Sequence, residues 1–184
     1  MKKTYKYYLL NIVTTCVVAL FFSCKDNFKE VQKMGISENE PIGIAENINL
    51  IHTDSGKVKA ILLSPKMLNY QNRDFPFFEF PNGITLDIFD DQNKKNVVVA
   101  DYAINYSETK LIDLQGNVKI TTSTNDTLYA EQLFYDQATE WLFTNKPVKF
   151  VKQGDVYFGN GFDSNSKFSN AQVLELTGTM TLDE

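Results

Sequence analysis

Short runs of alternating apolar and polar residues dominate the chain from residue 111 to residue 162. These runs are rich in Val, Ile, Thr, Tyr and Phe. Clusters of turn-forming residues separate them: Gln115-Gly116-Asn117, Thr124-Asn125-Asp126, Asp136-Gln137-Ala138-Thr139, Asn145-Lys146-Pro147 and Gln153-Gly154-Asp155. Strand-like runs with turn signals roughly every 8 to 12 residues predict an antiparallel, all-β architecture.

Similar runs flank this stretch on both sides. We expect strands at residues 49–53, 57–62, 84–89 and 97–106, and a closing stretch at 168–182. The segment Phe75–Phe80 reads FPFFEF, and Pro76 restricts it to a sheet edge or a strand start. An aromatic rim of a lipid or partner site is the other interpretation of this segment. No run of ten or more residues with the helical period follows residue 24.

The first 24 residues have the layout of an export signal. Lys2, Lys3 and Lys6 precede an uncharged, mostly apolar run at residues 7–22, and Ser23-Cys24 follows it. A small residue directly before a cysteine resembles a bacterial lipoprotein cleavage site, which predicts acylation of Cys24. An uncleaved membrane anchor is the alternative. We expect an anchor at 1–24, a polar tether at 25–47 and one β domain at 48–184, held outside the cytoplasm.

Charge and composition exclude several classes of function. The formal net charge is −5, and removal of the three N-terminal lysines leaves −8, which argues against a nucleic-acid partner. His52 is the single histidine and there are two cysteines, too few for a zinc site, so we expect no metal and no cofactor. Motifs for phosphate loops, dinucleotide binding and nucleophile elbows are absent, so we do not expect an enzyme. A glycan hydrolase, which needs two converging carboxylates, is the least favoured class.

Alternation at period two gives the strands of the central stretch one apolar face. We expect this face either to line a hydrophobic groove between two sheets or to form an ordinary sandwich core. A slip of one residue would exchange the two faces of a strand. The groove candidates are Val118, Ile120, Leu128, Leu133, Tyr135, Trp141, Phe143, Val148, Phe150, Val156, Phe158 and Phe162.

Several motifs in the central stretch resemble a known family when they are taken in order. They are Asp113–Val118, Asp126–Leu128, Leu133–Asp136, Thr144–Val148 and Gly159–Phe162, with Phe168 downstream. Together with the N-terminal segment they resemble the LptC family, the membrane-tethered periplasmic component of lipopolysaccharide export. Soluble LptA-like bridge proteins share the repeat, and the N-terminal anchor favours LptC.

The resemblance implies a fold and a function. The fold is a twisted, incompletely closed antiparallel β-jellyroll with two facing sheets. The function is to accept lipopolysaccharide from the permease subunits of an inner-membrane ABC transporter and pass it to a periplasmic LptA-like bridge protein, at the periplasmic face of the inner membrane. Gly159 and Gly161 would lie near an open edge that receives the bridge by β-augmentation, so a bulky residue there is expected to weaken docking. A structural or adhesive surface lipoprotein with a closed β-sandwich core is the alternative.

Overall fold

The computed structural model describes residues 40–90 and 92–177, and its regular structure is entirely β-strand within that part of the chain. The strands are β1 (Gly43–Asp54), β2 (Lys57–Tyr70), β3 (Phe77–Phe80), β4 (Ile84–Phe89), β5 (Lys95–Ala100), β6 (Tyr102–Tyr106), β7 (Leu111–Thr121), β8 (Thr127–Asp136), β9 (Trp141–Lys152), β10 (Asp155–Asn165), β11 (Gln172–Val173) and β12 (Leu176–Thr177). All the pairings between them are antiparallel, which confirms the predicted fold class.

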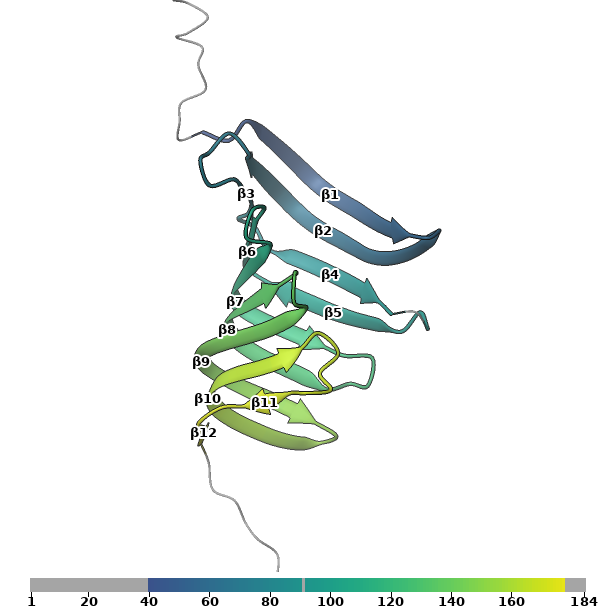
Figure 1. The fold of residues 1–184 in the computed structure, drawn as a ribbon, viewed down its shortest axis with the longest axis vertical. Helices are drawn as coiled ribbons and strands as arrows, with labels where there is room; N and C mark the ends of the chain where they lie inside the picture. Colours follow the sequence, from purple (N-terminus) through teal and green to yellow (C-terminus); the bar gives the residue numbers. More distant parts are fainter. Residues whose placement is uncertain (1–39, 91, 178–184) are drawn as a thin grey trace, which may run out of the picture. The chain divides into compact units, whose positions relative to one another are not determined.

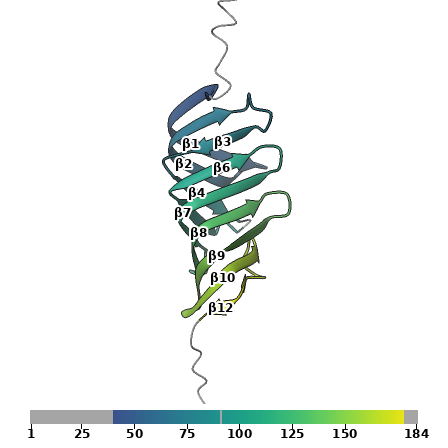
Figure 2. The same ribbon diagram turned by 90° about the vertical axis from the view of Figure 1, so that its left-hand side faces the viewer.

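The strands form a meander that is folded lengthwise into two facing sheets. Each long strand starts in one sheet, bends, and ends in the other. Strand β2 shows this plainly, because its residues 60–63 pair with β4 and its residues 68–70 pair with β3. Strands β3 and β4 are two halves of one bent strand position, as are β5 and β6. The positions follow one another from β1 at one end of the domain to β10 at the other (Figures 1 and 2).

We call the two layers the first sheet and the second sheet. The first sheet contains β4, β5 and the parts of β1, β2, β7, β8, β9 and β10 that pair beside them, and the second sheet contains β3, β6 and the remaining parts. Strand β7 pairs with β5 through 119–121 and with β6 through 111–115, so it belongs to both sheets. These pairings link the strands around the bend, but the sheets do not close into a barrel.

The bends use residues with a positive backbone φ. Gly83, Gly116, Asn117 and Gly161 all have one, and bulges interrupt the pairing of β7, β8 and β10 at the same level. A Cβ atom at Gly83 would lie 2.8 Å from the carbonyl oxygen of Ala100. Glycine is therefore required where the chain turns from one sheet into the other.

Two segments that we expected to be turns are bends inside long strands. Gln115-Gly116-Asn117 lies within β7, and Asn145-Lys146-Pro147 lies within β9, so these two turn predictions are wrong. The physical reason is that a bend between sheets needs the same residues as a hairpin turn. The expected turns at 124–126, 136–139 and 153–155 do connect neighbouring strands.

Several expected boundaries also differ. Strand β2 continues to Tyr70, beyond the end expected at residue 62. The single strand expected at 97–106 is divided at Asp101, whose backbone N–H donates to the carbonyl of Gly116 and whose carboxylate accepts a 2.6 Å hydrogen bond from Asn117 Nδ2. Strand β1 begins at Gly43, inside the segment expected to be tether. Residues 25–39 of that tether and the anchor with Cys24 lie outside the described residues.

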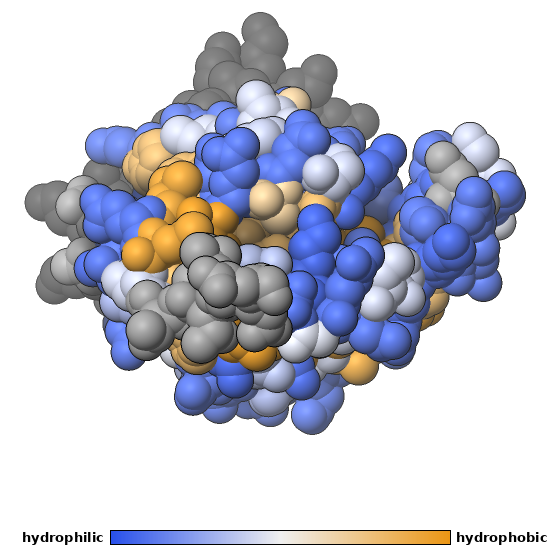
Figure 3. Space-filling model, turned by 90° about the horizontal axis from the view of Figure 1, so that it is seen from below, coloured by the Kyte–Doolittle hydropathy of each residue, from blue (hydrophilic) through white to orange (hydrophobic). Residues whose placement is uncertain are grey.

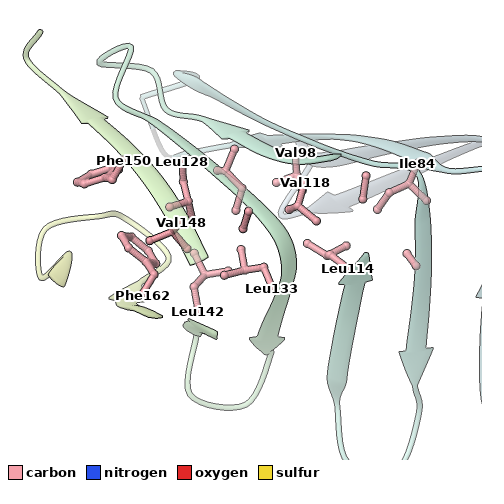
Figure 4. Close-up of a cluster of buried hydrophobic side chains, with 14 of the residues drawn as sticks. Ile84, Val98, Leu114, Val118, Leu128, Leu133, Leu142, Val148, Phe150 and Phe162 are labelled. Carbon is pink, nitrogen blue, oxygen red and sulfur yellow. The ribbon is translucent and has the colours of Figure 1, made fainter. Parts of the chain in front are cut away.

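The hydrophobic core lies between the two sheets. In Figure 4, Val98, Val118 and Leu128 from the first sheet point toward Leu114 and Leu133 from the second. Leu133 and Phe162 are completely buried, and Val118 and Leu128 are 1% exposed. Most of the expected apolar face of the central stretch therefore packs inside the fold.

After β10 the chain returns along that strand as a segment that we call the strap, residues 166–177. It contains β11 and β12, which pair with β10 at only two positions each. Leu174 donates a further backbone hydrogen bond of 2.9 Å to Gly161. The strap therefore covers the edge of β10 at the end of the domain opposite β1 (Figure 1).

Candidate functional site

Rows of apolar side chains cross the interior from strand to strand. One row follows the pairings Leu62–Leu86, Leu86–Val98, Val98–Ile120, Ile120–Leu128 and Leu128–Phe150. Neighbours in a row share one face of the sheet, because paired residues project to the same side. The first sheet therefore presents a continuous apolar strip to the interior.

Depth divides these interior residues into two groups. Val98, Ile120, Leu128 and Phe150 are buried in the core cluster. A second group packs against that cluster while remaining partly exposed, and we call it the rim: Leu62, Leu86, Phe78, Ile112 and Tyr135. The rim comes from both sheets, with Leu62 and Leu86 on the first and the other three on the second. Apolar surface thus continues from the dry core toward water.

Eight of the twelve groove candidates lie on this interior face. Seven are buried in the core cluster: Val118, Ile120, Leu128, Leu133, Val148, Phe150 and Phe162. Tyr135 is half-buried and belongs to the rim. Alternation along β7, β8, β9 and β10 thus assigned these eight residues to the face that the structure gives them.

Four candidates lie on the outer face instead. Trp141 and Phe143 alternate with Leu142 and Thr144, and it is the latter two that are buried. The ring of Phe143 stacks on Phe134 at 5.4 Å, and the Trp141 indole donates to Asp163, all on the outside of the second sheet.

Val156 and Phe158 are displaced in the same way. Each is 48% exposed on the outer face, while Tyr157 and Gly159 face inward. The sequences WLF and VYF have apolar residues on both faces, so alternation does not decide between them.

The rim residues of β2, β3 and β4 were not among the candidates. Leu62, Phe78 and Leu86 come from strands before the central stretch, where the sequence analysis assigned no groove positions. Alternation in 57–62 and 84–89 is the signal that could have found them.

The interior is nearly free of charge over the described residues. The buried hydroxyls include Ser64, which donates a 2.8 Å hydrogen bond to the carbonyl of Gly83, and Ser164, which donates a 2.9 Å hydrogen bond to the carbonyl of Asn165. Two carboxylates are also buried: Asp113, which alternates with the core residue Leu114 and accepts from two glutamines, and Asp126, in the turn before β8. Burial raises the pKa of Tyr135 above its usual value, and the negative charges of Glu140 and Asp136 raise it further. The phenol is therefore neutral at physiological pH, and the rim offers no fixed charge there.

An aromatic cluster packs in the interior at the β10 end. The rings of Phe150, Phe162 and Phe168 lie 5.3 to 5.9 Å apart. Phe168 belongs to the strap, is 4% exposed and has a φ of 58°, a backbone conformation that is unfavourable for a bulky residue. Its packing against the other two rings compensates for that strain.

Gly159 and Gly161 make room for the strap. A Cβ atom at Gly159 would lie 2.3 Å from the carbonyl oxygen of Leu174 and 2.5 Å from Cγ1 of Val173. At Gly161 it would lie 3.1 Å from Cβ of Leu174, and φ there is 132°. These glycines therefore lie under a segment of the same chain, and the β10 edge beside them is already partly paired.

Within residues 40–90 and 92–177, no three His, Cys, Asp or Glu side chains are grouped to hold a metal ion. No helix in that part of the chain is long and apolar enough to cross a membrane.

The sequence model described as "Lipopolysaccharide-assembly, LptC-related" matches residues 8–181, nearly the whole chain. The chain belongs to the LptC family. LptC proteins are components of lipopolysaccharide transport in the cell envelope, and the family is not enzymatic. A search of curated proteins finds no match to this chain. The bent, unclosed β-jellyroll is therefore the scaffold of a lipopolysaccharide transport component.

Proposed function

We propose that this LptC-family protein binds the acyl chains of lipopolysaccharide between its two sheets and passes the lipid along the row of strands. The observation that carries the proposal is the rim, because its apolar side chains continue the buried core into partly exposed surface on both sheets. Each CH₂ group that leaves water contributes about 0.8 kcal/mol, so a few acyl chains supply ample binding energy. The near absence of charge among the described interior residues lets the chains slide without breaking strong bonds.

The proposal extends to the partners and to the membrane. Lipopolysaccharide would arrive from the permease subunits of an inner-membrane ABC transporter and leave toward an LptA-like bridge protein at the β10 end. Acylation of Cys24, or retention of the apolar run at 7–22, would hold the domain at the periplasmic face of the inner membrane. Several fatty chains on one anchor, or a whole apolar segment, would suffice for stable attachment.

Photo-crosslinking in cells that make lipopolysaccharide tests the interior path. A photoreactive phenylalanine analogue replaces Phe78 or Tyr135 on the rim, and Phe143 on the outer face serves as the matched aromatic control. We expect lipopolysaccharide adducts from the two rim positions and none from Phe143. Equal labelling at all three positions would contradict the proposal, and so would labelling at Phe143 alone. If neither rim position gives adducts, the result favours the structural or adhesive lipoprotein with a closed core.

A further inference from the structure

A group of aromatic side chains lies where β2 passes into β3. The rings of Tyr70 and Phe77 stack at 4.7 Å, and Phe75 and Phe77 lie 5.4 and 6.1 Å from the ring of Tyr106. The guanidinium carbon of Arg73 lies 5.0 Å from the centre of the Tyr70 ring. We call these five residues the aromatic corner.

The aromatic corner faces away from the interior. Tyr70 pairs with Phe77 and Phe77 pairs with Tyr106, so the three share one face of the second sheet. The next residue, Phe78, is on the opposite face and belongs to the rim. Phe75 is 46% exposed even though its ring is held beside Tyr106. The corner is therefore an ordered, water-facing aromatic surface that the interior path does not use.

The corner lies at the end of the domain where the chain enters. Ile42 donates a 2.8 Å backbone hydrogen bond to the carbonyl of Asn69, directly before the corner begins. Strands β1 and β3 lie at the same end of the domain (Figure 1). Seventeen residues lie between Cys24 and Ile42, which makes eighteen steps along the chain, and a chain spans at most about 3.3–3.6 Å per step. An anchor at Cys24 would thus keep the corner within roughly 65 Å of the bilayer.

We infer that the aromatic corner docks on the surface of the bilayer that holds the N-terminal segment, an inference that rests on the anchoring in the proposed function. Aromatic rings are favoured at the interface between lipid and water, where one side of the ring is apolar and the other is wet. Docking would fix the β1 end of the domain against the membrane.

The net charge of the chain favours docking by insertion of the aromatic rings into the bilayer surface and not by electrostatic attraction to the lipid. The chain without its three N-terminal lysines has a formal charge of −8, so anionic lipid repels the domain as a whole. Asp74 lies next to Arg73 in the loop and offsets its charge locally. We therefore expect docking to be insensitive to salt and similar on anionic and zwitterionic lipid.

Fluorescence quenching tests the inference on the full chain. The reporter is Phe75→Trp, the control is Phe158→Trp, and the unchanged chain supplies the background from Trp141. The control is well matched, because Phe75 and Phe158 are 46% and 48% exposed and lie at opposite ends of the domain. The protein is reconstituted into vesicles of phosphatidylethanolamine and phosphatidylglycerol, or of phosphatidylcholine, with and without brominated acyl chains.

We expect brominated lipid to quench the Phe75→Trp reporter roughly twofold or more beyond the control, in both lipids and at high salt. Equal quenching of the two reporters overturns the docking, and it would leave a glycan or a protein as the occupant of the corner. Quenching that disappears at high salt overturns insertion as the mechanism.

A second readout needs no substitution. Hydrogen exchange at the backbone amides of 71–75 should slow when the unchanged chain passes from detergent to vesicles, while exchange at the 153–154 turn should not. Unchanged exchange at 71–75 overturns the docking.

Flotation of the vesicles distinguishes failure of the docking from failure of the membrane anchoring. A chain that floats with the vesicles but shows an unquenched reporter overturns the docking alone. A chain that does not float overturns the anchoring and the docking with it.

Discussion

At the scale of single residues, stability depends on a few side chains that link the two sheets. Leu133 is completely buried, and its neighbours in the core come from both layers (Figure 4). The opposite case is Leu63, which is 44% exposed on the outer face of the first sheet. The two leucines differ in surroundings and share their chemistry, so they form a natural pair for comparison.

We expect Leu133→Ala to lower the free energy of unfolding by about 2–5 kcal/mol, because it leaves a cavity that the sheets only partly fill. Leu63→Ala should change it by no more than about 0.5 kcal/mol, as an exposed surface position. Urea denaturation followed by circular dichroism measures both. Equal losses for the two variants would mean that the interior is not the source of stability.

At the scale of elements, the strap is held by little regular structure. Its strands β11 and β12 are two residues each, and Leu174 and Leu176 remain 42% and 60% exposed. Exposed apolar side chains interrupt the mostly hydrophilic surface at this end of the domain (Figure 3). The strap thus covers the β10 edge where we place the bridge protein, and it presents apolar residues of its own.

Gly159→Ala is expected to loosen the strap. The new Cβ would meet the Leu174 carbonyl at 2.3 Å, and overpacking of this kind costs about 1–3 kcal/mol. Backbone amides of 172–177 should then exchange hydrogen roughly tenfold faster or more. Gly43→Ala is the control, since its Cβ would meet only Asn69 Cβ at 3.7 Å. Exchange at 172–177 that is unchanged by Gly159→Ala would show that the strap adjusts without opening.

The same glycines change the expectation for the bridge protein. From the sequence, a bulky residue at Gly161 was expected to weaken docking directly at an open edge. The structure places the strap over that edge, so Gly161→Arg should displace the strap first. Gly161→Arg and Gly159→Ala should therefore alter capture of the bridge protein in the same direction. Opposite effects would show that the partner contacts Gly161 itself.

The sequence predicted the architecture well and the register less well. Punctuated strand runs predicted an antiparallel all-β architecture, and the family resemblance implied that its sheets are not closed. Alternation in β7 and β8 placed Val118, Leu128 and Leu133 on the interior face. Alternation was ambiguous at Trp141–Phe143 and Val156–Phe158, where apolar residues occupy both faces. The bend at Gly116-Asn117 was read as a turn, because local composition reports a positive φ but not whether the strand continues beyond it.

At the scale of the whole molecule, partly buried tyrosines make stability depend on pH. Burial raises the pKa of Tyr102, with a contribution from its 2.8 Å hydrogen bond to Glu79, and burial also raises the pKa values of Tyr106 and Tyr135. The unfolded tyrosines lose their protons near the ordinary value of 10.0. Above that pH the unfolded state binds fewer protons than the folded state, so stability falls as pH rises.

We expect the contribution of these tyrosines to the free energy of unfolding to be constant below pH 10 and to fall above it. Tyr102→Phe should reduce the slope, since it removes one titrating group, although it also removes a hydrogen bond and lowers stability by about 1 kcal/mol at neutral pH. Urea midpoints at a series of pH values measure the slope. An identical alkaline slope in Tyr102→Phe would show that Tyr102 does not contribute to it.

The line of bends has a mechanical consequence. Because the long strands cross between the layers through a bend, the two sheets are joined along one line. We expect a small rotation at Gly116 or Gly161 to separate the far ends of the strands, because displacement grows with distance from the bend. Under the proposed function, the spacing of the two sheets would then adjust to acyl chains of different bulk.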